Sequence, residues 1–161
     1  MDLSALPHPP ALTPLDGRYR PIVVPLVDSL SEAALNRARM VVEIEWLITL
    51  SKRGILPGAP ELSAAECDYL RAIPDNFDAD QIEELGAIEA ETRHDVKAVE
   101  YFLKRRLINA PAVLGSQTVL PQMAEIVHIF CTSEDINNLA YALIIQDAIR
   151  RVWLPAAHEL V

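Results

Sequence analysis

The sequence predicts an all-α fold. Apolar residues recur at intervals of three and four, capping signals precede these stretches, and no alternating β-branched run lies between hairpin turns. Of the 161 residues, 51% are hydrophobic and 23% are charged, which is typical of a globular protein. This length suits one domain, or a small domain and the start of a second.

Residues 1–28 are rich in proline, which fixes φ and removes a backbone donor. We therefore expect an irregular N-terminal arm without a helix. From Ser29 the pattern changes, because Ser29 and Glu32 have the spacing of a capping box and Gly54 stands where a helix would end. The apolar stripe of this helix consists of Leu35, Ala38, Val42, Trp46 and Leu50.

Three shorter helices are expected next. Ser63 and Glu66 repeat the capping box, and Pro74 should stop the helix that follows, whose apolar face carries Leu70 and Ile73. Asp78 opens another, with Ile82, Leu85 and Ile88 inward and Glu83, Glu84 and Glu91 in solvent. Thr92 should cap the third through Asp95, with an apolar stripe of Val96, Val99, Leu103 and Leu107.

The longest periodic segment follows Thr132 and Ser133. Its apolar positions are Ile136, Leu139, Ala140, Leu143, Ile149 and Val152, and Pro155 should kink or end it. We expect three parts: the arm at 1–28, an N-terminal helical domain at 29–115, and the start of a central helical-bundle domain at 116–161. Because residues 154–161 are still apolar and compatible with a helix, we expect the chain to be a fragment.

Composition narrows the function. A net charge of −9 disfavours nucleic acid and anionic membranes as partners, and charged residues interrupt the most apolar stretches, so no membrane span is expected. Cys67 and Cys131 lie far apart and are expected to be free, buried thiols. No glycine-rich phosphate loop, paired metal-ligand motif or nucleophile elbow is found. Without a signal segment, the expected location is cytoplasmic.

Three polar clusters are candidates for a binding site. The first, Asp16-Gly17-Arg18-Tyr19, is also explained by a turn, although arginine and tyrosine suit the capture of a nucleotide. The second, Thr92-Arg93-His94-Asp95, places cations at an expected helix start, where an anion would offset them. The third, His128 with residues 132–138, is explained by helix capping except for Asn137 and Asn138, which are weak helix formers.

Together these clusters carry a resemblance to a known family. Residues 13–19 (TPLDGRY), 93–104 (RHDVKAVEYFLK) and 128–138 (HIFCTSEDINN) make the sequence similar to adenylosuccinate lyases of the fumarase and aspartase superfamily. The resemblance implies β-elimination of fumarate from adenylosuccinate, giving AMP, and from the succinylated aminoimidazole carboxamide ribotide of purine biosynthesis. It implies no metal or organic cofactor.

The resemblance also assigns roles to residues. Those expected to contact substrate are Arg18, Tyr19, Arg93, His94, Asp95, Thr132 and Ser133, with His128 in support. The general acid, a histidine, and the general base, a serine, are expected beyond Val161, so this fragment should bind substrate without turning it over. Because Thr92 and Asp95 are expected to cap the helix, His94→Ala should lower the activity of the full-length enzyme with little effect on folding.

The resemblance implies a homotetramer whose long central helices form a shared bundle and whose active sites draw on several subunits. Two alternatives stay open at this point. One is a sibling lyase of the superfamily, such as fumarase, aspartase or argininosuccinate lyase. The other is a helical interaction module without catalysis.

Overall fold

The structure, a computed structural model, describes residues 12–160, and all regular elements in that range are helical. The all-α prediction is therefore confirmed there. The long helices are α3 (Glu32–Lys52), α4 (Ala64–Asp75), α5 (Ala79–Thr92), α6 (Asp95–Asn109) and α9 (Ser133–Ala148). The short ones are α1 (Arg20–Val23), α2 (Val27–Leu30), α7 (Pro111–Leu114), α8 (Leu120–Met123) and α10 (Leu154–His158).

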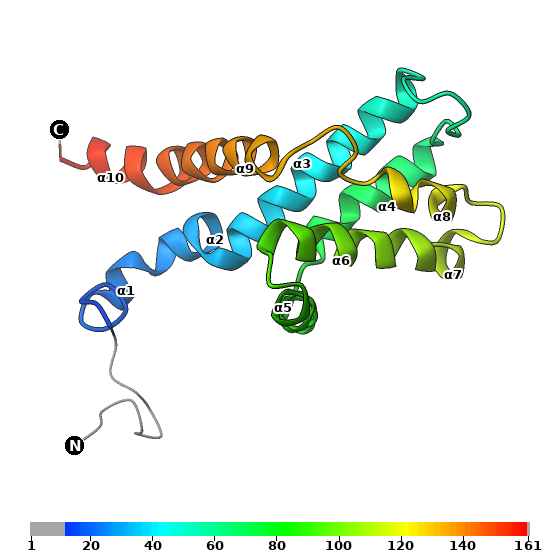
Figure 1. Cartoon of the computed structure of the whole chain (residues 1–161). Coiled ribbons are helices and arrows are strands. Elements are labelled where there is room, and N and C mark those ends of the chain that lie inside the picture. The colour runs from blue at the N-terminus through cyan, green and yellow to red at the C-terminus, as the bar shows by residue number, and fades with distance from the viewer. Residues whose placement is uncertain (1–11, 161) are drawn as a thin grey trace.

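Helix α3 runs through the middle of the molecule, and α4, α6 and α9 pack against it while α5 covers α6 (Figure 1). The main core joins α3, α4, α5, α6 and α8 around buried side chains that include Met40, Leu70, Leu85, Phe102 and Met123. Helix α9 meets α3 through a separate small cluster of Ala38, Ala140, Ile144 and Leu35. The middle of α9 is therefore attached to α3 by a narrow apolar strip.

The prediction of no helix in the N-terminal arm is wrong for part of it. Residues 1–11 lie outside the described range, but α1, a 3-10 turn at Val24–Leu26 and α2 follow one another between residues 20 and 30. Pro21 and Pro25 occupy the first positions of two of these turns. A proline costs little there because the first N–H groups of a helix have no intrahelical partner.

The first predicted cap is two residues out of place. The hydroxyl of Ser31, not of Ser29, accepts the N–H of Ala34 at the start of α3, while the buried Ser29 donates to Asp147 on α9 at 2.6 Å. The predicted end is confirmed. Gly54 has φ +57°, and the N–H groups of Gly54 and Ile55 bond the carbonyls of Ser51 and Leu50, which is a Schellman motif.

The remaining caps and faces are mostly as predicted. The Ser63–Glu66 capping box and the Asp78 cap both form, and the stripe from Val96 to Leu107 on α6 is buried. Helix α4 continues one residue past Pro74, because the proline sits in its last turn. Both cysteines are free, but Cys131 is only half-buried.

Other predicted faces are corrected by the structure. Ile82 is exposed rather than inward, and Glu84 is half-buried, where it pairs with Arg106. Of the apolar positions predicted for the last segment, Leu139, Leu143 and Ile149 are exposed. Pro155 does not end the last helix. A π-helical turn at Ile149–Trp153 widens the backbone just before it, and α10 continues.

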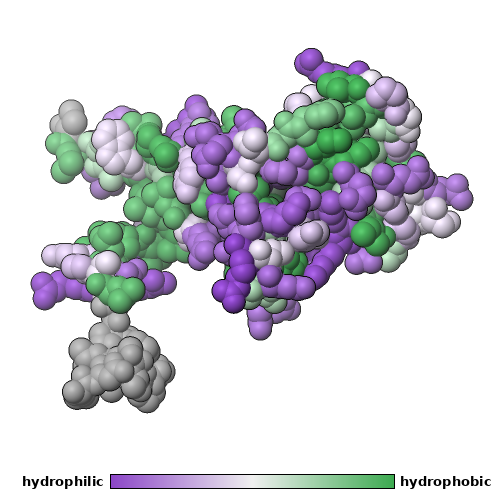
Figure 2. Space-filling model, in the orientation of Figure 1, coloured by the Kyte–Doolittle hydropathy of each residue, from purple (hydrophilic) through white to green (hydrophobic). Residues whose placement is uncertain are grey.

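Figure 2 shows hydrophobic surface along the segments that extend from the body, where α2 and the end of α9 lie. The exposed large apolar residues of α9 and the π turn are Leu139, Tyr141, Leu143, Ile145, Ile149 and Trp153. A surface of this kind on a helix is typical of a face that packs on another chain or segment. Among the described residues, no helix is long and apolar enough to cross a membrane.

Candidate functional site

The second and third polar clusters meet where α6 and α9 begin. The two helices present their N-terminal ends to each other, and Nε2 of His94 lies 3.4 Å from Oγ of Ser133. These residues are 39 positions apart in sequence. Unpaired N–H groups and the positive dipole end make a helix start favourable for anions, so two such starts with exposed polar side chains suit an anionic ligand group.

The cap of α6 differs from the prediction. His94, not Thr92, is the N-cap residue, and its Nδ1 accepts the N–H of Lys97 at 3.2 Å. An accepting Nδ1 places the proton of the neutral imidazole on Nε2. His94 therefore presents an N–H donor to Ser133 and to solvent, while Thr92 is the last residue of α5.

Arg93 belongs to the end of α5 rather than to the start of α6. It is the C-cap of α5 and has φ +55°, in the left-handed region. A cation is favourable at that end of a helix, so no ligand is needed to explain its charge. Its side chain is exposed.

The start of α9 is held by Asp135. Its carboxylate accepts the N–H of Thr132 at 2.7 Å and the hydroxyl of Thr132 at 2.9 Å. The backbone hydrogen bond and then the side-chain hydrogen bond from Thr132 lower the pKa of Asp135. Asn138 donates to the carbonyl of Glu134 at 2.8 Å, which ties its amide to the first turn of the same helix.

Sequence analysis missed Arg39, which the structure places behind this site. The side chain of Arg39 is 5% exposed, and its guanidinium donates to Asp95 on α6 at 2.5 Å and to Asn137 on α9 at 2.9 Å. Asn137, the weak helix former at the start of α9, is thereby explained as an acceptor for a buried charge. Arg39 and Glu43 lie one turn apart on the same face of α3, and both are buried, although the sequence alone does not separate them from the other charged residues of this helix.

His128, which precedes α9, forms a polar contact with the buried Glu43 of α3. Its Nδ1 lies 2.5 Å from Oε1 of Glu43, whose side chain is fully buried. Burial raises the pKa of Glu43, and the contact with His128 only partly offsets this. Trp46, the next turn of α3, donates to the carbonyl of Ile129 at 2.8 Å. Glu43 and Trp46 of α3 therefore hold the turn that leads into α9.

Residues with left-handed backbone conformation lie just before α6 and just before α9. Within residues 12–160, the non-glycine residues with positive φ are Arg93 at +55°, His128 at +67° and Phe130 at +64°. Such conformations are strained for residues other than glycine and cluster at functional sites. All three precede α6 or α9 by a few residues, and thus flank the His94–Ser133 contact.

Arg18 and Tyr19 are not brought to this contact within the chain. Both are exposed, and among the described residues neither has a side-chain hydrogen bond to the other clusters. Asp16 and Gly17 form a turn, with both N–H groups bonded to the carbonyl of Thr13. The turn leads directly into α1, which lies far along the extended end of the molecule from the start of α6 (Figure 1).

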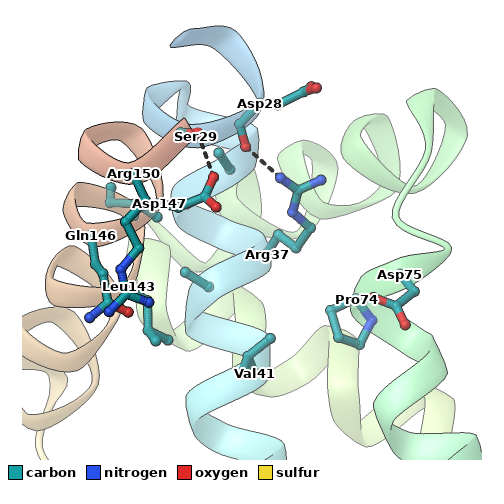
Figure 3. Close-up of a pocket in the computed structure, with 13 residues that line it drawn as sticks. Asp28, Ser29, Arg37, Val41, Pro74, Asp75, Leu143, Gln146, Asp147 and Arg150 are labelled. Atoms are coloured by element: carbon teal, nitrogen blue, oxygen red, sulfur yellow. Dashed lines mark hydrogen bonds between the residues drawn. The ribbon is translucent and has the colours of Figure 1, made fainter. Parts of the chain in front are cut away.

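Two cavities of the described chain lie away from the contact between His94 and Ser133, whereas Arg93 lines a third one with Gly86 and Glu89 of α5. One of about 360 Å³ is formed by α2, α3, the end of α4 and α9, with Arg37 bonded to the carbonyl of Asp28 and Ser29 to Asp147 at its wall (Figure 3). A more apolar groove of about 680 Å³ lies between α3 and α9, with Trp46, Phe130 and Leu139 in its wall. None of the candidate site residues lines either cavity, and no group of potential metal ligands is found in residues 12–160.

Comparison with curated proteins supplies the family. The whole chain aligns at 40% identity with the adenylosuccinate lyase of Haemophilus influenzae, and at 38% with those of Escherichia coli K12 and Legionella pneumophila Corby. Over its whole length, this chain is similar to the adenylosuccinate lyases. It spans about a third (33%) of the length of each of these relatives. No family model matches the chain.

The adenylosuccinate lyase relationship covers all three motif segments, because each alignment includes every residue of the chain. It therefore includes α3 with Arg39 and Glu43, which the motifs alone did not single out. The resemblance to adenylosuccinate lyases seen in the motifs is confirmed.

Proposed function

We propose that the chain is the substrate-binding part of an adenylosuccinate lyase that releases fumarate from adenylosuccinate and from the succinylated aminoimidazole carboxamide ribotide. The observation that carries the proposal is the contact between His94 and Ser133. It joins, at two helix starts, two of the three segments through which the sequence resembles this family. Both substrates carry carboxylates and a phosphate, which such a site can bind.

We assign the site to Arg93, His94, Asp95, Thr132 and Ser133, with His128 in support. The Nε2–H of His94 and the hydroxyl of Ser133 would donate to one anionic group of the substrate. Asp95 would act by holding its neighbour, since its carboxylate is already engaged by Arg39 and by the N–H of Val96. Arg18 and Tyr19 would complete a site on another copy, which the distance along the extended N-terminal segment supports.

The reaction explains why binding and chemistry would be separate. β-Elimination removes a proton from carbon while the C–N bond breaks and the leaving nitrogen gains a proton, so it needs a positioned base and a positioned acid. His94 and Ser133 contact each other at the site we assign to binding. We propose that the acid and base come from further sequence, that the chain alone is inactive, and that no metal or organic cofactor takes part.

We also propose a homotetramer located in the cytoplasm. The exposed apolar residues of α9 and the groove between α3 and α9 would be covered by helices of other copies. In this proposal residues 116–161 begin the central bundle domain and residues 29–115 form the N-terminal domain. The separate apolar cluster that joins α9 to α3 supports assigning α9 to a different domain, while α8 shares the main core with the N-terminal helices.

The test is calorimetric titration of the chain with AMP and with adenylosuccinate, together with an assay of fumarate release on the same sample. We expect binding without fumarate release, and weaker binding by the Ser133→Ala variant. Fumarate release by the chain alone would show that the chemistry is misplaced. For the full-length protein, turnover of malate, aspartate or argininosuccinate, without turnover of adenylosuccinate, would contradict the proposed substrate.

A further inference from the structure

Arg39 takes part in a closed set of contacts that links α3, α6 and α9. Its Nη2 donates to Asp95, the residue that follows His94, and its Nε donates to Asn137, one turn after Ser133. The contact between His94 and Ser133 completes the set. The position of one guanidinium is thus connected to both side chains of the candidate site by short, rigid pieces of helix.

All three kinds of nitrogen in this guanidinium are engaged. Besides Asp95 and Asn137, Nη1 donates to the side-chain oxygen of Asn36 at 2.8 Å. With 5% of the side chain exposed, Arg39 cannot reach a ligand and needs these partners to offset its desolvation. Its role must therefore be exerted through the residues that it holds.

Only arginine suits this position. Its planar fork fixes the directions of its donors, so partners on three elements are held at set angles as well as distances. A lysine ammonium would keep the charge and could pair with Asp95. It has no rigid fork with which to hold Asn137 and Asn36 at the same time.

We propose that Arg39 is a positioning residue that sets the separation of His94 and Ser133, so that the two side chains bind one anionic group together. The proposal rests on the proposed function for the identity of that group. It does not depend on it for the geometry, which can be measured without a ligand. The same contact network places Asn137, through Arg39, among the residues that determine the shape of the site.

The test compares Arg39→Lys with Arg71→Lys by NMR on the whole 161-residue chain. Arg71 is the matched control because it pairs through Nε and Nη2 with Glu45, at 2.6 and 2.9 Å, on the exposed surface between α4 and α3. We expect a nuclear Overhauser effect between the His94 ring and the Ser133 side chain in the unmodified chain. It should be lost in Arg39→Lys and kept in Arg71→Lys.

Folding of each variant is judged from the contact between the rings of Phe77 and Phe102, whose centroids are 5.9 Å apart in the main core. If Arg39→Lys loses that contact, Asn137→Ala replaces it, because this variant removes one partner and leaves the charge pair with Asp95. Persistence of the His94–Ser133 effect in a folded variant would overturn the proposal. Its absence from the unmodified chain would do the same.

A second readout is the affinity for AMP. Loss of one ordered contact should weaken AMP binding about tenfold in Arg39→Lys and leave it unchanged in Arg71→Lys. If the unmodified chain does not bind AMP, the proposed function of the isolated chain fails. The NMR comparison still decides whether Arg39 positions His94 and Ser133.

Discussion

Nε2 of His94 lies 3.4 Å from Oγ of Ser133, and the same histidine caps α6 through Nδ1. One ring therefore serves two purposes, since Nδ1 caps the start of α6 and Nε2 faces the candidate site. The two roles are separable by substitution because they use different atoms.

The first prediction follows from this division. His94→Ala should lower the free energy of unfolding by about 1 kcal/mol, because the N–H of Lys97 loses its cap. His94→Ala should also weaken nucleotide binding, because the Nε2–H donor is lost. His94→Asn should recover most of the stability, since asparagine is a good N-cap residue, but it should not restore nucleotide binding. Urea unfolding and calorimetry measure the two effects, and equal stability of the alanine variant and the unmodified chain would show that the cap does not form.

Acid stability should depend on Glu66. Burial opposes its ionisation, but hydrogen bonds from Thr118, from the N–H and hydroxyl of Ser63, and from the N–H of Val119 outweigh it and lower the pKa to about 2. The unfolded value near 4.5 is higher, so the ionised form stabilises the fold above pH 4.5, and this contribution is lost as the pH falls towards 2. It corresponds to roughly 3 kcal/mol.

Glu66→Gln should remove most of this pH dependence. Melting temperatures between pH 2 and pH 5 test it, with Glu61→Gln, which alters an exposed carboxyl just before α4, as the control. Parallel curves for the Glu66 variant and the unmodified chain would contradict the assignment.

Glu43 should affect the pH dependence of stability in the opposite direction to Glu66, and at higher pH. Burial raises its pKa above 4.5, so the neutral form stabilises the fold below that pH, and the contribution is lost as the pH rises through the folded-state pKa. Glu43→Gln stays neutral and can still bond His128. We expect it to flatten the decline of melting temperature above pH 4.5, and an unaltered decline would count against a raised pKa.

The exposed face of α9 should cause self-association. Leu139 is 58% exposed and lines the groove between α3 and α9, so Leu139→Glu should shift the chain towards monomer. Ile108→Glu is the control, because Ile108 is similarly exposed, at 56%, near the end of α6. Sedimentation equilibrium measures the effect, and a strictly monomeric unmodified chain would refute the prediction.

The local signals were sufficient for most of the helices. The capping box at Ser63, the cap at Asp78 and the left-handed Gly54 are all formed from residues close in sequence, so they could be predicted without knowledge of packing. The start of α6 could not be predicted in this way, because Thr92, His94 and Asp95 lie within four residues and each carries a side-chain acceptor for a helix N–H group. The choice of His94 depends on α5 ending at Arg93, where the chain reverses through positive φ.

The all-α class, the order of the main helices and the resemblance to adenylosuccinate lyases could be predicted from the sequence, because they depend on periodicity, caps and motifs that are local. The contact of His94 with Ser133, and the role of Arg39 and Glu43 of α3 in holding the segments around it, required the folded structure. Contacts between residues 39 to 98 positions apart follow from helix packing, in which burial decides which polar side chains must find each other. The distance of Arg18 and Tyr19 from the His94–Ser133 contact could not be predicted either, because no short-range signal fixes the direction of the N-terminal segment.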